Sequence, residues 1–300
     1  MSSGEEKIHA LLSASKHYEF LPDAATNIWI FLLSINHNRI GQKATFCKRV
    51  MLGIVCYFKI LNKQTLRHIF RLLRCEAVHK VPCAIHIPSS ITELPPYALQ
   101  NCARLTSVFI PTSVVRIGAL AFDGCMLLAS IDIPRSVSNI GDGCFCACQT
   151  LTTVVIPPSI SMLRDHTFSY CSSLVSVVIP DSVTSIGDEV FSNCTSLAAV
   201  VLPPSVKRLG EEAFKKCSSL VFVHIPRSVQ HIERCAFLNC TSLPSVVIPN
   251  SVSYLNYHTF YGCTALESVV IPDSVSNIGL HSFYGCSSHD VIMRVRTPCS

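Results

Sequence analysis

The sequence predicts a solenoid of stacked parallel β-strands, because three residue types recur at a fixed step of 23 residues. Each copy contains a proline, a serine two residues after it, and a cysteine near the end of the copy. The prolines are Pro88, Pro111, Pro134, Pro157, Pro180, Pro203, Pro226, Pro249 and Pro272. The cysteines are Cys102, Cys125, Cys148, Cys171, Cys194, Cys217, Cys240, Cys263 and Cys286. Nine copies in register without an insertion indicate a repeat protein.

Each copy begins with a short strand. In the second copy, Leu105, Val108 and Ile110 have strand spacing, and Val108 and Ile110 share one face. Pro111 ends the strand because proline has no amide hydrogen for a ladder. A single copy cannot bury its own apolar face, so the copies must stack, with their strands pairing in parallel about 4.8 Å apart.

The rest of each copy returns the chain to the next strand, and we predict an irregular or short-helical return. Glycines such as Gly118 mark the bend, and a phenylalanine precedes the cysteine by three residues in every copy but the first. Stacked Cβ atoms about 4.8 Å apart exceed the roughly 3.8 Å typical of disulfides, so we expect free, buried packing thiols. The serine hydroxyls are expected to satisfy turn amides.

This repeat resembles the BspA-like class of leucine-rich repeats over residues 83–288. One copy reads Leu174-x-x-Val177-x-Ile179-Pro180-x-x-Val183-x-x-Ile186-Gly187-x-x-x-Phe191-x-x-Cys194. The resemblance implies a right-handed leucine-rich repeat solenoid, over a domain of residues 81–288, with a parallel sheet on its concave face. It also implies a family that includes surface proteins adhering to matrix or host proteins, and it implies no reaction.

Alternate strand residues point away from the core and form the candidate binding face. The candidate residues are Phe109, Asp132, Val155, Val178, Val201, Phe222, His224, Val247 and Val270. An exposed apolar strip of this size more often marks a protein interface than an accident. The sequence therefore predicts binding of an unknown protein ligand, with the suitability of valine for strands as the alternative explanation.

The repeats show no catalytic motif. A glycine-rich phosphate loop, a GxSxG elbow and an HExxH helix are all missing from the sequence. Two groups resemble zinc sites only superficially. Cys75, His79, Cys83 and His86 lack a Cys-x-x-Cys knuckle, and in the cluster Cys144, Cys146 and Cys148, Cys148 belongs to the buried column and Cys144 to a column of small residues. We therefore expect a non-enzymatic chain with no cofactor and no metal.

The composition combines many hydrophobic residues with few charged ones. Of 300 residues, 49% are hydrophobic and 14% are charged, against about a quarter charged in an average soluble domain. No stretch reaches the roughly 18 apolar residues of a spanning helix, and residues 1–25 carry four acidic residues in place of a signal-peptide core. We therefore expect no membrane span and a cytoplasmic chain whose 17 cysteines stay reduced, with surface exposure as the alternative.

Residues 1–80 depart from the repeat and are basic. They hold 12 Lys/Arg against 5 Asp/Glu, whereas residues 81–300 hold 12 against 14. Leu66, Ile69, Phe70 and Leu73 follow helical spacing, which predicts an α-helical N-terminal region whose apolar face caps the first repeat. The region lacks a nucleic-acid reader motif and aromatic stacking platforms, so its charge does not predict nucleic-acid binding.

A weaker resemblance covers residues 21–49. The module that it implies would span residues 20–62. Leu21-Pro22-Asp23, Trp29 and Cys47-Lys48-Arg49 look like an F-box, the short helical module that docks on the Skp1 adaptor of ubiquitin ligases. The match departs at Ala24, Ala25 and Thr26. The resemblance implies an F-box substrate receptor as an alternative function, beside the cell-surface adhesion protein implied by the repeats; a plain helical cap is the other interpretation.

Residues 289–300 are predicted to end the stack with an edge strand and a tail. His289 and Arg294 stand where the repeat has leucine and isoleucine. The last strand is expected near residues 291–295, and its charge discourages edge-to-edge association.

Overall fold

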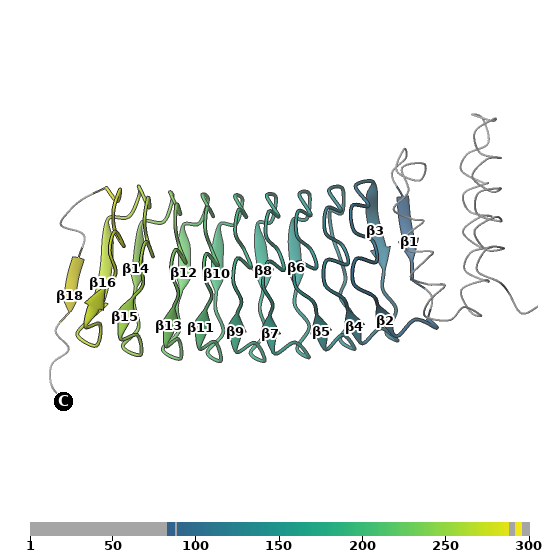
Figure 1. Ribbon diagram of the computed structural model, residues 1–300, viewed down its shortest axis with the longest axis horizontal. Helices are drawn as coiled ribbons and strands as arrows, with labels where there is room; N and C mark the ends of the chain where they lie inside the picture. Colours follow the sequence, from purple (N-terminus) through teal and green to yellow (C-terminus); the bar gives the residue numbers. More distant parts are fainter. Residues whose placement is uncertain (1–82, 88, 288–291, 296–300) are drawn as a thin grey trace, which may run out of the picture. The chain divides into compact units, whose positions relative to one another are not determined.

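A computed structural model describes residues 83–87, 89–287 and 292–295. Over this part of the chain, each 23-residue copy forms one turn of a solenoid, and the turns follow one another in a row (Figure 1). The described residues include no helix, and therefore no helix long and apolar enough to cross a membrane. The predicted N-terminal helices and the F-box-like segment lie outside the described residues.

A first row of strands runs along one side of the stack. Its members are β1 (Cys83–His86), β3 (Leu105–Phe109), β6 (Thr153–Val155), β8 (Ser176–Val178), β10 (Ala199–Val201), β12 (Phe222–His224), β14 (Ser245–Val247), β16 (Ser268–Pro272) and β18 (Ile292–Val295). The pairs are all parallel and, except for Cys83 with Leu105, join equivalent residues of successive copies, as Val154 joins Val177. The third copy contributes only a bridge from Ser130 to Thr153. The strand expected near residues 291–295 is β18, which pairs with β16.

A second row of two-residue strands follows the first. Its members are β2 (Glu93–Leu94), β4 (Arg116–Ile117), β5 (Asn139–Ile140), β7 (Met162–Leu163), β9 (Ser185–Ile186), β11 (Arg208–Leu209), β13 (His231–Ile232), β15 (Tyr254–Leu255) and β17 (Asn277–Ile278). The prediction of one strand per copy missed this row, because two residues are too few to show alternation. The row ends at corners where turns lie close together: a Cβ at Gly210 would overlap the carbonyl of Gly187.

The third side of each repeat consists of hydrogen-bonded β-turns without a helix, so the irregular form of the predicted return is confirmed over the described residues. Two positions per copy are left-handed, for example Leu120 at φ 56° and Gly124 at φ 71°. The amides of Leu120 and Phe122 then donate to the carbonyls of Asp142 and Cys144 in the next turn, both at 2.8 Å. A helix would use these amides internally, whereas here they join neighbouring turns.

Phenylalanine and cysteine fill the core in two parallel columns. The rings from Phe122 to Phe283 stack at centroid separations of 5.2 to 5.8 Å, with planes within 16° of each other. The predicted burial of the cysteine column is confirmed, except that Cys286 is half-buried. Each sulfur from Cys125 onward also donates to a carbonyl of the preceding turn, as Cys194 Sγ does to Phe168 O at 3.1 Å.

Burial raises the pKa of these thiols well above their ordinary value of 9.0. Neighbouring thiols in the column add to the rise, and the hydrogen bond to the backbone opposes it. At Cys263 the same causes give a pKa of about 12. Because the thiolate is the nucleophile and the metal ligand, these thiols are chemically inert at neutral pH.

The serine column joins successive turns. Ser113 Oγ donates to the carbonyl of Ile91 at 2.7 Å, and Ser228 Oγ donates to Val206 at 2.7 Å. The same bond recurs from the second copy to the ninth. The prediction that these hydroxyls serve turn amides is therefore wrong: they act as donors to carbonyls, because the neighbouring amide, such as that of Val114, bonds within its own turn.

Candidate partner-binding face

The outward side of the first row, called the strand face below, carries the candidate residues predicted from the sequence. Eight of these nine residues are exposed, and Val270 on β16 is half-buried. The exposed fraction is 63% for Val155 and 61% for both Val201 and Val247. The structure therefore places the predicted residues on one surface, at equivalent positions of successive turns.

Strand alternation explains why these valines are exposed. Val154 is 2% exposed although it directly precedes Val155, and Val200 is 1% exposed beside Val201. The parallel register then sets each outward residue next to its equivalent, as in the pairs Val155 with Val178 and Val201 with His224. The result is a stripe of valines, interrupted by His224, over strands that pair in short sheets: β6 with β8, β10 with β12, and β14 with β16.

A column of small residues runs beside the valine stripe. Its exposed members are Ser107, Ser130, Thr153, Ser176, Ala199 and Ser245, with Phe222 as the bulky exception. Among the outward residues of both columns between β3 and β14, only Asp132 and His224 carry ionisable side chains. At the N-terminal end, the rings of His86 and Phe109 lie 5.6 Å apart. This surface is largely apolar, and its chemistry suits a contact in which apolar side chains are buried against a partner.

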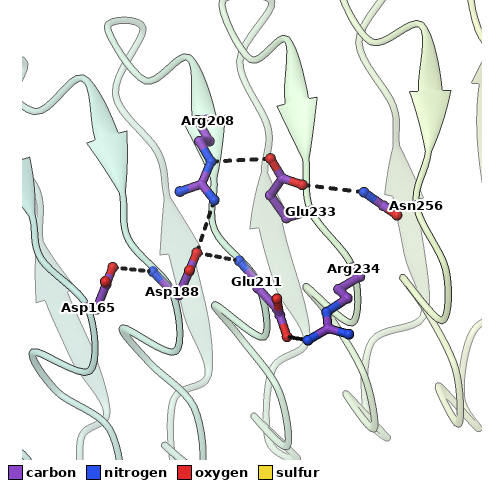
Figure 2. Close-up of polar contacts among 7 residues, drawn as sticks. All are labelled: Asp165, Asp188, Arg208, Glu211, Glu233, Arg234 and Asn256. Carbon is purple, nitrogen blue, oxygen red and sulfur yellow. Dashed lines mark hydrogen bonds and ion pairs between the residues drawn. The ribbon is translucent and has the colours of Figure 1, made fainter.

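A polar network lies across the second row of strands (Figure 2). Arg208 on β11 reaches in both directions along the stack, to Asp188 Oδ1 at 3.1 Å and to Glu233 Oε1 at 3.2 Å. Asn256 Nδ2 donates to the other oxygen of Glu233 at 3.3 Å. One arginine therefore links three successive turns, and the amide extends the chain of contacts to a fourth.

The acidic residues of this region also bond to the backbone (Figure 2). Asp165 Oδ1 accepts the amide of Asp188 at 2.8 Å, and Asp188 Oδ1 accepts the amide of Glu211 at 2.9 Å. Glu211 itself pairs with Arg234. These carboxylates therefore connect successive turns, both through backbone amides and through basic side chains.

The candidate metal groups do not form a site within the part of the chain that the structure describes. No group of three or more His, Cys, Asp or Glu residues is arranged there to hold a metal ion. Cys144 and Cys148 are buried, and burial raises the pKa of both thiols. Burial and the Asp123 carboxylate raise the pKa of half-buried Cys146 to about 12. Cys75 and His79, from the other group, lie outside the described residues.

Sequence reasoning missed an aromatic cluster on the returns of the last two turns. The rings of His258 and His281 stack with centroids 5.6 Å apart, and those of Tyr261 and Tyr284 stack at 5.2 Å. His281 is exposed, whereas His258 is half-buried. The signal was present in the sequence, since each pair is separated by one repeat of 23 residues.

The repeat, the two strand rows and the strand face now allow comparison with known proteins. The chain matches the family described as "BspA type Leucine rich repeat region (6 copies)" over residues 82–198 and 161–290, which together exceed half of its length. The chain belongs to the BspA-type leucine-rich repeat family. No curated protein matches it.

Among solved structures, this BspA-type chain is similar to a leucine-rich repeat protein of T. pallidum, with 28% identity over 68% of this chain and 76% of that one, at a TM-score of 0.41. A leucine-rich repeat protein from Bacteroides ovatus shares 27% identity over 68% and 76% of the two chains, at a TM-score of 0.32. A leucine-rich cell surface protein from Faecalibacterium prausnitzii shares 27% over 70% and 78%, at a TM-score of 0.36.

Proposed function

We propose that the chain is a non-enzymatic interaction module that binds another protein through the strand face. The observation that carries the proposal is the valine stripe, in which Val155, Val178, Val201 and Val247 are each at least 58% exposed. Complete burial of a fully exposed valine side chain contributes roughly 1.5–3 kcal/mol, so burial of the part still exposed contributes about 1–2 kcal/mol for each of these valines. Four such side chains on one surface therefore supply a large part of the free energy that a specific complex needs.

Rigidity of the platform supports the same proposal. The strands that carry the stripe pair in parallel register within short sheets, β6 with β8 and β10 with β12, and the side chains beneath them, such as Val154 and Val200, are buried. Valine has few rotamers to lose in a strand. Binding to a preorganised surface avoids much of the ordering cost that opposes association, so a modest apolar area is sufficient.

The proposal predicts that Val178→Asp combined with Val201→Asp abolishes partner capture. Two unpaired carboxylates buried against an apolar partner should weaken binding by about a hundredfold or more. Affinity purification of the full chain followed by quantitative mass spectrometry measures the loss. Val115→Asp is the matched control, because Val115 is 44% exposed but lies outside the strand face. Undiminished capture by the double variant would exclude the strand face as the interface.

We also propose a cytoplasmic location, because the core uses thiols as hydrogen-bond donors. Cys171 Sγ donates to Phe145 O at 3.1 Å and Cys217 Sγ to Phe191 O at 3.2 Å. A disulfide would remove such donors, and thiols persist in reducing compartments. Alkylation of the denatured protein, taken rapidly from its own cells, should modify all 17 cysteines. Cysteines that react only after reduction would contradict this location.

A further inference from the structure

The strand face is symmetric in its chemistry about Val178. Val155 and Val201 lie one turn to either side of it. Asp132 lies 46 residues before Val178 and His224 lies 46 residues after it, which is two turns in each direction at the same column position. All five side chains are exposed. An acid and a base thus stand at equal distances from a valine centre, about 10 Å along the stack.

We propose that the strand face binds a second copy of this chain, with the two stacks running in opposite directions around a two-fold axis that is parallel to the strands and passes over Val178. The inference rests on the proposed function and names the partner of the same face. A two-fold interface uses one surface twice, so that surface must complement itself.

The opposed arrangement pairs the charges of the strand face. Val178 meets Val178 of the second copy, and Val155 meets Val201 of the second copy. Asp132 then faces His224 of the second copy, and the same contact forms again on the other side of the axis. Imidazole N–H groups donate hydrogen bonds to carboxylates, and a protonated imidazole adds charge attraction. The two ionisable side chains of the stripe are thereby paired rather than buried alone.

The neighbouring column complements itself in size. About the same axis, Phe222 meets Ser130 of the second copy, and Thr153 meets Ala199. Phe222 is 53% exposed and is the one large side chain in its column between β3 and β14. Ser130 belongs to the third copy, whose first row is reduced to a single bridge. The bulkiest outward residue therefore faces a small one, and this happens at both ends of the interface.

The spacing of the stripe favours a sheet as its partner. Its valines repeat at the strand separation of about 4.8 Å. Side chains on one face of an extended peptide repeat about every 6.7 Å, and those on one face of a helix repeat about every 5.4 Å, the length of one helical turn. A second parallel sheet repeats at the same step, and sheets pack face to face about 10 Å apart. This chain supplies such a sheet.

A two-fold axis along the stack is the competing geometry for two copies. It would set Asp132 over Asp132 and His224 over His224 of the second copy. Like charges placed directly opposite each other destabilise a sheet contact, and in a buried interface they discriminate strongly against wrong arrangements. The charges therefore select the opposed arrangement, and exchanging them provides the test.

Sedimentation equilibrium of the full chain over a range of concentrations tests the proposal. Wild type should form dimers. Asp132→His sets imidazole against imidazole and His224→Asp sets carboxylate against carboxylate, so each should weaken dimerisation about tenfold or more. The double variant, Asp132→His with His224→Asp, restores the pairing and should recover wild-type affinity within about threefold. Circular dichroism and thermal unfolding verify that each exposed substitution leaves the fold intact.

The possible results separate this inference from the proposed function. A wild-type chain that stays monomeric overturns the inference, and so does a dimer that is insensitive to both single substitutions or is not restored by the double variant. If the monomer still captures a different protein, and Val178→Asp with Val201→Asp prevents that capture, the proposed function stands with another partner. A monomer that captures nothing overturns both.

Discussion

Raising the pH from about 8 to about 10 should remove a large part of the stability of the solenoid. The folded-state pKa of the column thiols is raised by burial above the ordinary value of 9.0, as at Cys171, Cys194 and Cys217. A raised folded pKa means that stability is fully present below pH 9.0 and is lost as the pH rises from there toward the folded pKa, because only the unfolded chain releases the proton.

The size of this effect follows from the number of thiols. Each deeply buried thiol loses about 1.4 kcal/mol of stabilisation per pH unit above its unfolded pKa. For seven such thiols of the column the loss at pH 10 is about 10 kcal/mol, against a total stability of about 5–15 kcal/mol for a typical domain. The seven are Cys125, Cys148, Cys171, Cys194, Cys217, Cys240 and Cys263.

Urea denaturation followed by circular dichroism, in reducing buffers from about pH 7 to 10, measures this alkaline loss. Cys194→Ser is the matched variant, because a hydroxyl keeps the donor to Phe168 but does not ionise in this range. Its stability should fall less steeply with pH, by the share of one thiol. A free energy of unfolding that stays constant between pH 8 and 10 would show that the buried thiols do not control alkaline stability.

Phe191→Ala should lower the free energy of unfolding by about 4–6 kcal/mol, which combines the cost of a Phe-to-Ala cavity with the loss of two ring contacts. Phe191 is 0% exposed, and its ring stacks between Phe168 at 5.8 Å and Phe214 at 5.4 Å. Truncation interrupts the column at its middle. Because each turn contacts only its neighbours, the two halves should also unfold less cooperatively.

Urea titrations at neutral pH test this second expectation through the midpoint and slope of the transition. Tyr257→Ala is the matched control, since Tyr257 is 57% exposed and the loss of its side chain should change stability by no more than about 0.5 kcal/mol. If Phe191→Ala costs no more than Tyr257→Ala, the stacked rings are not a major source of stability.

The repeat, the first strand row and the buried columns could be predicted from the sequence, because every copy solves the same packing problem with the same residues. Phe122, Cys125 and Ile110 lie in the core where their spacing placed them. The second row and the inter-turn returns could not be predicted, since they depend on hydrogen bonds between backbones. Leu120 and Glu189 adopt the left-handed backbone conformation, although neither leucine nor glutamate is a residue type that indicates it in a sequence.

Prediction of the candidate site had a similar limit. Alternation in the strands was enough to place Val155 and Val201 on the exposed surface. It could not show that Ser113 acts as a donor, because a hydroxyl can donate or accept, nor that Asp188 binds an amide and an arginine at once. These roles depend on what the adjacent turn presents, and one copy read alone does not contain that information.

The bonds on the three sides of each turn have a consequence for how such a chain can change its length. Every turn offers its neighbours an equivalent set of donors and acceptors, as the serine and cysteine bonds show. Gain or loss of a complete repeat preserves all of these contacts, whereas a one-residue insertion misaligns them together. A repeat inserted between Asp132 and His224, however, shifts the midpoint between these two residues. The midpoint then lies between two turns and no longer at Val178. The fold tolerates a change of length that the pattern on its surface does not.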